Sequence, residues 1–246
     1  MRKLNKEKTK ALLVAVLFLI IILFTTRTIV ARGVLGLGNQ FFGGVLPHSL
    51  QIADTSYKTA LFFDAEVPDA WHQRARIAFL RGDFEDALVK INKQLEIHGD
   101  SFMASYYIRG LIYGYDEQFE KAEQDFVTFL KWDPTSWAAN NDLAWIYFAQ
   151  GKFKETKAQS EVGLAYNQNN PWLHMMHAMA VYNLGDVDSA YEELLKAKED
   201  ATKLVEDDWA KAYPGNDPKI AGRGLSEFKK TIERNIELVH NKKINL

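Results

Sequence analysis

The residues best suited to chemistry are two histidines, His174 and His177, on one predicted helix. Their spacing places both imidazoles on the same helix face, among Met175, Met176 and Met179. Imidazoles and thioethers are ligands that Cu(I) accepts, so a metal or haem chaperone is one alternative function. We favour a packing or groove role, because these positions fall in a helix that belongs to a repeat. The expected metal and cofactor content is therefore none.

Other catalytic signatures are missing from the sequence. It contains no H-E-x-x-H, G-x-S-x-G or phosphate-loop motif, and it has no cysteine to serve as nucleophile or thiolate ligand. The Gly36-x-Gly38 pair lacks a third glycine, since position 41 is Phe. The acidic run at 206–208 has no partner motif and predicts a solvated turn. We expect no catalytic residues, no enzyme activity and no small-molecule substrate.

A small residue returns about every 34 positions along the chain, at Ala53, Ala87, Ala122, Thr156 and Ala190. Glycine stands five residues before it at positions 82, 151 and 185, whereas position 117 is Glu. Apolar residues between these markers recur at helical spacing, and alternating strand-type runs are absent. The fold class is therefore predicted to be all-α, with one helix pair per period stacking on the next.

This pattern resembles the tetratricopeptide repeat (TPR), a helix-turn-helix unit. The best match begins at Met103 and comprises Tyr106, Arg109, Gly110, Tyr113, Ala122, Phe126 and Pro134. The resemblance covers roughly residues 48–205. It implies a solenoid of about four to five units over residues 48–211, followed by a linker and an amphipathic capping helix within residues 212–246. We expect one charged helix from Glu192 to Lys211 and a second from Lys219 to Lys243.

The resemblance also implies a concave groove lined by one face of each first helix. Carried onto this sequence, the groove positions are Tyr107, Leu111, Tyr115, Asn141, Trp145, Phe148, Trp172, Met175, Met179 and Tyr182. Aromatic and methionine side chains around one amide suit an apolar peptide or helix. The expected function is a scaffold or assembly factor that binds a protein or peptide partner. In a competing arrangement, the C-terminal helix folds back and fills the groove.

The N-terminus predicts a membrane anchor. Residues 1–10 form a basic tail with a local charge of +4, and Ala11–Phe24 is an unbroken apolar run. We expect a transmembrane helix over residues 11–31, with Arg27 reaching the far interface, and a Gly-rich connector over residues 32–47. The basic tail favours a cytoplasmic N-terminus and an extracytoplasmic array in a bacterial-type inner membrane. A cleavable signal peptide and a cytosol-facing adaptor are the alternatives.

Charge argues against nucleic acid as a partner. The formal net charge is −2, and the seven basic residues and one acidic residue before position 34 leave about −8 for the rest of the chain. Binding to a phosphate backbone requires clustered Lys and Arg, which this part of the chain does not offer.

Overall fold

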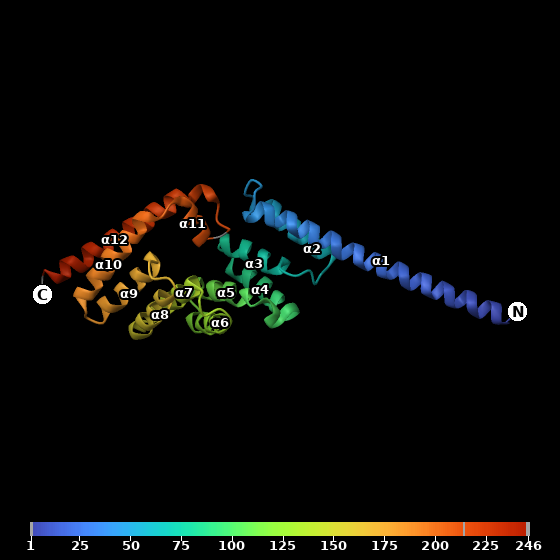
Figure 1. The fold of residues 1–246 in the computed structure, drawn as a ribbon, viewed down its shortest axis with the longest axis horizontal. Coiled ribbons are helices and arrows are strands. Elements are labelled where there is room, and N and C mark those ends of the chain that lie inside the picture. The colour runs from blue at the N-terminus through green and yellow to red at the C-terminus, as the bar shows by residue number, and fades with distance from the viewer. Residues whose placement is uncertain (1, 214, 245–246) are drawn as a thin grey trace. The chain divides into compact units, whose positions relative to one another are not determined.

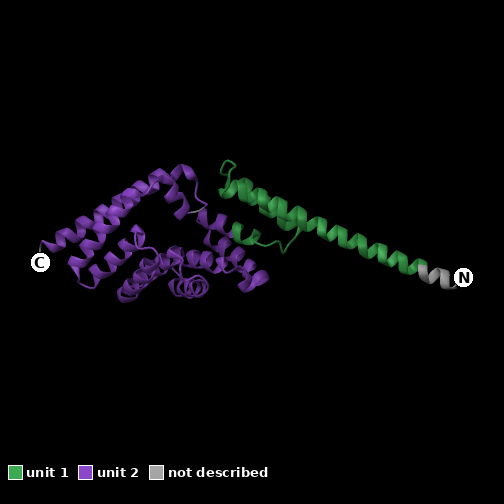
Figure 2. Cartoon of the chain, in the orientation of Figure 1, with its two compact units in different colours: residues 1–74 green, residues 75–246 purple. Residues whose placement is uncertain are grey.

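The computed structural model describes residues 2–213 and 215–244, with side chains from Lys8 onward (Figure 1). The side chains of the basic residues at positions 2, 3 and 6 therefore lie outside the described set. Every regular element in these ranges is helical, which confirms the all-α fold. The chain divides into two compact units, residues 1–74 and 75–246 (Figure 2).

The helices follow one another in short steps along the chain. They are α1 (Arg2–Gly43), α2 (Leu50–Phe63), α3 (Ala70–Leu80), α4 (Phe84–His98), α5 (Ala104–Tyr115), α6 (Phe119–Trp132), α7 (Trp137–Ala149), α8 (Phe153–Tyr166), α9 (Pro171–Asn183), α10 (Val187–Lys203), α11 (Glu206–Ala212) and α12 (Ala221–Lys243), with 3-10 turns at Gly99–Phe102 and Pro218–Ile220. Within the second unit, α5 pairs with α6, α7 with α8 and α9 with α10, and α12 packs on α10 as a terminal helix.

In the first unit, the C-terminal part of α1 packs along α2. The segment expected to be a Gly-rich connector is thus helical as far as Gly43, and the loop is confined to the residues after it. Close packing explains why position 38 is glycine: a Cβ there would lie 2.6 Å from Cε1 of Tyr57. Residues 32–43 therefore continue α1 and pack on α2.

The small residues that mark the repeat lie where two helices meet. The side chains of Ala53, Ala87, Ala122, Thr156 and Ala190 are all 0% exposed. Thr156, the one polar member, donates its hydroxyl to the Lys152 carbonyl at 2.9 Å, so its burial leaves no unpaired group. The 34-residue period in the sequence is therefore the period of helix packing.

The turn inside each repeat needs a left-handed residue. Gly82, Gly151 and Gly185 have φ of 76°, 72° and 94°, and each donates its N–H three residues back. Glu117 takes the same place with φ of 59°, and the N–H of the next residue, Gln118, bonds back to the Tyr113 carbonyl as in the glycine turns. Left-handed backbone costs a non-glycine residue about 1–2 kcal/mol.

We expect Glu117→Gly to stabilise the protein. Relief of the left-handed strain outweighs the extra backbone entropy that glycine has in the unfolded chain, leaving a net gain of about 0.5–1 kcal/mol. Chemical denaturation followed by far-UV circular dichroism measures it. Gln118→Gly, one residue on, has φ of −88° and is expected to destabilise instead. A loss of stability in Glu117→Gly would contradict the turn assignment.

The prediction of a single charged helix from Glu192 to Lys211 is wrong. α10 ends at Lys203, and the acidic run at 206–208 forms the first turn of the separate helix α11, with Glu206 and Asp207 exposed to solvent. Lys229 of α12 donates to the Leu204 carbonyl at 3.2 Å, which satisfies a backbone group freed at the break. The break lets Trp209 and Tyr213 pack against Trp172 and Phe228.

Candidate functional site

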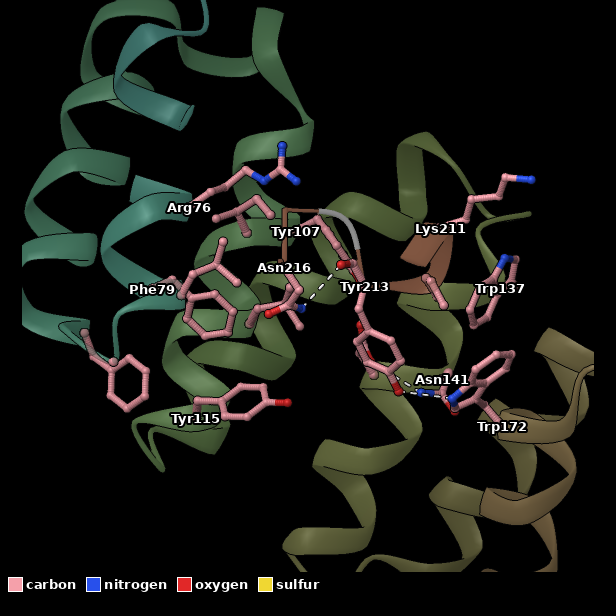
Figure 3. A pocket seen from close by; sticks show the side chains of 18 residues that line it. Arg76, Phe79, Tyr107, Tyr115, Trp137, Asn141, Trp172, Lys211, Tyr213 and Asn216 are labelled. Atoms are coloured by element: carbon pink, nitrogen blue, oxygen red, sulfur yellow. Dashed lines mark hydrogen bonds between the residues drawn. The ribbon is translucent and has the colours of Figure 1, made fainter. Parts of the chain in front are cut away.

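A cavity of about 560 Å³ lies within the second unit (Figure 3). Its wall comes from α3 and the start of α4, from α5, from α7, from the first turn of α9, and from the segment that ends α11. The lining residues are Arg76, Phe79, Leu80, Gly82, Phe84, Tyr107, Ile108, Leu111, Tyr115, Trp137, Ala138, Asn141, Asp142, Trp172, Lys211, Ala212, Tyr213 and Asn216. This volume is in the range of pockets that bind small molecules or a few peptide side chains.

Helical spacing places several residues of the cavity wall on one face of their helix. Tyr107, Leu111 and Tyr115 are four residues apart on α5, and Trp137 and Asn141 have the same spacing on α7. The hydroxyl of Ser136 accepts the Ala139 N–H at 3.4 Å, which fixes where α7 begins and so where Trp137 points. First helices of successive repeats therefore present one face each to the cavity.

A carboxylate forms the polar part of this wall. Tyr107 donates its hydroxyl to Oδ2 of Asp142 at 2.7 Å, and the Asn141 side-chain amide donates to Oδ1 at 3.3 Å. Burial raises the pKa of Asp142 to about 6, against these two hydrogen bonds, which lower it. The Asn141 oxygen is buried and accepts no hydrogen bond. The wall thus offers hydrogen-bond acceptors in mainly aromatic surroundings.

The opposite wall is held by the C-terminal segment. Trp172 stacks on Trp137 with ring centroids 5.5 Å apart, and its indole N–H donates to the Tyr213 hydroxyl at 3.0 Å. Asn216 in turn donates its amide to the Tyr213 carbonyl at 3.3 Å (Figure 3). The groove between first helices is therefore closed on one side by residues of its own chain.

The family model of the tetratricopeptide repeat matches residues 104–136, which span α5, α6 and the turn after them. Residues 104–136 are therefore a tetratricopeptide repeat, and the chain has the fold of TPR proteins. A search of curated protein sequences finds no match.

Solved structures show the same fold at low sequence identity. PilW, described as a widely conserved type IV pilus biogenesis factor, has TM-score 0.64 and 20% identity, over 85% of this chain and 93% of PilW. PilF of Pseudomonas aeruginosa has TM-score 0.64 and 16% identity, over 88% and 99% of the two chains. YrrB, described as a TPR protein with an unusual peptide-binding site, has TM-score 0.54 and 16% identity, over 63% and 79%. At these identities the likeness concerns the fold alone.

The ten groove positions expected from the TPR resemblance fall into two groups. Five line the cavity: Tyr107, Leu111, Tyr115, Asn141 and Trp172. The other five lie outside it: Trp145, Phe148, Met175, Met179 and Tyr182. The terminal helix explains part of this division, because Met175 and Tyr182 pack against a buried cluster to which α12 contributes Val239. The competing arrangement, with the C-terminal helix folding back, thus describes the last repeat, whereas the central repeats keep an open cavity.

Aromatic packing accounts for two more of the residues outside the cavity. The Trp145 ring lies 5.3 Å from that of Tyr115, and Phe148 contacts Phe153 with centroids 5.4 Å apart. The cavity residues missed from the sequence include Asp142 and Tyr213. The position of Asp142 next to a groove asparagine was a usable signal, but nothing local marks Tyr213.

The His-Met cluster of α9 is engaged in protein contacts in this TPR structure. His174 Nδ1 lies 2.7 Å from Glu193 Oε2, and its Nε2 lies 2.8 Å from the Gln168 carbonyl oxygen. His177 Nε2 lies 3.4 Å from Glu161 Oε1. Among the described residues, no group of three or more His, Asp or Glu side chains is arranged to hold a metal ion. The histidines join α9 to α8 and α10.

This histidine pairing predicts a pH-dependent stability. Burial disfavours the charged imidazole, but hydrogen bonds with Glu193 and the Gln168 carbonyl outweigh it, so the pKa of His174 is raised above 6.5. The hydrogen bond with His174 holds the pKa of Glu193 below 4.5. The contribution of His174 is complete below the unfolded pKa of 6.5 and is lost as the pH rises through the higher folded value.

We therefore expect His174→Gln to lower the melting temperature more at about pH 5.5 than at about pH 8.5. Glu193 is ionised at both pH values, so the difference reports the imidazole. Thermal melting followed by circular dichroism gives the result, with His98→Gln as control because that residue has no carboxylate ion pair in the described structure. An equal loss at both pH values would contradict a charged His174.

Proposed function

We propose that this TPR protein is a membrane-anchored scaffold that docks an apolar segment of a protein partner in the cavity of its central repeats. The observation that carries the proposal is the cavity of about 560 Å³ with walls of aromatic side chains from successive first helices. Large rings with few rotatable bonds bind apolar groups with little loss of conformational entropy. The fold shared with PilW, described as a type IV pilus biogenesis factor, supports an assembly role.

The anchor is proposed from α1. Lys8–Gly43 is the one helix in the described part of the chain that is long and apolar enough to cross a membrane, by length and composition. Its apolar residues before Arg27 are exposed, whereas Ala31 is fully buried with Ala60. Arg27 Nε donates to the Phe63 carbonyl at 3.1 Å. We therefore place the far end of the membrane segment at Arg27, rather than at Ala31 as the sequence suggested.

The length fits this assignment. From Lys10 to Arg27 the helix rises about 25 Å, and long basic side chains at both ends extend toward the headgroups. The basic tail favours an array outside the cytoplasm. Fusing alkaline phosphatase, which is active only outside the cytoplasm, after Leu246 tests this orientation. Activity of a cytoplasm-only reporter at the same position would reverse it.

Site-specific photocrosslinking in intact membranes tests the docking site. A photoreactive phenylalanine analogue replaces Tyr115, which lines the cavity and is 55% exposed. The matched control replaces Tyr166, which ends α8, is 53% exposed and lies outside the cavity. We expect a discrete crosslinked protein from position 115 and none from position 166.

A second variant ties the crosslink to the cavity. Leu111→Asp introduces a charge into the wall beside Tyr115 and should abolish the adduct while the chain stays in the membrane. Equal adducts from positions 115 and 166, or an adduct insensitive to Leu111→Asp, would place the docking surface elsewhere on the array.

A further inference from the structure

The carboxylate of Asp142 in the cavity wall has hydrogen-bond acceptor positions that the chain does not fill. An ionised carboxylate has about four acceptor positions, and those of Asp142 receive one hydrogen bond from Tyr107 and one from Asn141. The Asn141 oxygen is buried without a donor. Its amide orientation is fixed by chemistry, because the flipped amide would turn its oxygen toward the carboxylate. A carboxylate with open acceptor positions in the wall of an aromatic cavity calls for a ligand that donates hydrogen bonds.

The cations of the chain that border the cavity do not fill this role. The Lys211 ammonium pairs with Asp207 at 2.6 Å. The guanidinium of Arg76 points away from Asn141, and so does the end of Lys211 (Figure 3). The groups that influence the ionisation of Asp142 are the neutral donors Tyr107 and Asn141, and its pKa of about 6 leaves it mostly ionised at neutral pH. The carboxylate thus faces the cavity without a counter-ion.

The remaining walls suit a cation as well. Rings of Tyr107, Tyr115, Trp137, Trp172 and Tyr213 line the same space. Aromatic faces attract ammonium groups, by about 2 kcal/mol or more when the cation is desolvated. They also pack against a methylene chain, so this lining matches both halves of a lysine side chain.

We propose that the cavity binds a lysine side chain of the partner, with its ammonium donating to Asp142 and its methylene stem lying between the aromatic rings. This inference rests on the proposed function, since it names the residue that the docking cavity selects. A compact ammonium has three donors to offer to the acceptor positions left open on the carboxylate. Docked in this way, lysine supplies the counter-ion that the carboxylate lacks.

The test uses the full chain in an uncharged detergent and two short peptides. Fluorescently labelled acetyl-Leu-Lys-Leu-amide is compared with the norleucine peptide, which keeps the stem and lacks the ammonium. We expect the lysine peptide to bind at least about tenfold more tightly by fluorescence anisotropy. Asp142→Asn, which can still accept from Tyr107, should remove that difference, whereas Glu199→Gln, at an exposed carboxylate of α10, should keep it.

Three results of the peptide experiment would overturn the inference. Equal binding of both peptides, or a lysine preference that survives in Asp142→Asn, overturns the inference while leaving an apolar docking cavity in place. Absence of binding by both peptides overturns it too, and the crosslinking at Tyr115 then decides separately whether the cavity docks a partner. If Asp142→Asn does not fold, the ratio between the two peptides in the parent chain decides alone.

Discussion

Trp172→Ala is expected to lower the free energy of unfolding by about 3–5 kcal/mol, the range for truncating a large buried aromatic side chain. The indole is 7% exposed and stacks on Phe228 of α12 with centroids 4.8 Å apart and planes 15° apart. It also stacks on Trp137 and donates to Tyr213. One substitution therefore removes contacts to α7, to α12 and to the segment that closes the cavity.

Urea denaturation followed by far-UV circular dichroism measures this loss. Trp132→Ala is the control, because Trp132 is 61% exposed and we expect a change below about 1 kcal/mol. We also expect trypsin to cut the C-terminal helix earlier in Trp172→Ala, since Phe228 loses its partner. Equal losses in the two variants would mean that the terminal helix is not held through Trp172.

Asp125→Ala is expected to cost about 3 kcal/mol of unfolding free energy. Asp125 lies on α6 and accepts two hydrogen bonds from Arg109 of α5, at 2.7 and 2.8 Å. Its side chain is 6% exposed and that of Arg109 is 22% exposed. Removing the carboxylate leaves a largely buried guanidinium without its partner, and partial exposure of Arg109 keeps the cost at the lower end for buried pairs.

Chemical denaturation compares this variant with Glu96→Ala. Glu96 pairs with Lys93 across one turn of α4, with side chains 69% and 44% exposed, so its loss should cost at most about 0.5 kcal/mol. Arg109 also donates to Asn92 of α4, so the double variant Asp125→Ala, Asn92→Ala should be less stable still. A loss in Asp125→Ala no larger than that in Glu96→Ala would show that the pair is solvated.

The sequence by itself determined the helix pairs and their period. Where two helices of a repeat cross, only a small side chain fits, so the markers from Ala53 to Ala190 appear in the sequence at fixed spacing. Because the left-handed turn favours glycine, most of the turns inside the repeats could be recognised in the sequence. Glu117 shows the limit of this rule, because its turn forms with a non-glycine residue at some cost in strain.

Half of the expected groove residues could also be placed from helical spacing. Tyr107, Leu111 and Tyr115 share a face of α5 in any helix that spans them, and Asn141 follows from the same argument on α7. What lies opposite these faces does not follow from periodicity. Met175 and Tyr182 hold equivalent positions on α9, yet they pack against a buried cluster that includes Val239 of α12.

Only the tertiary structure decided how the cavity is closed. Tyr213 meets Trp172 across 41 residues of sequence, and the end of α10 at Lys203 allows that contact. The packing of residues 32–43 on α2 likewise involves a close approach, between Gly38 and Tyr57. Such features arise from packing between distant segments, whereas periodicity reports only which face of a helix is buried.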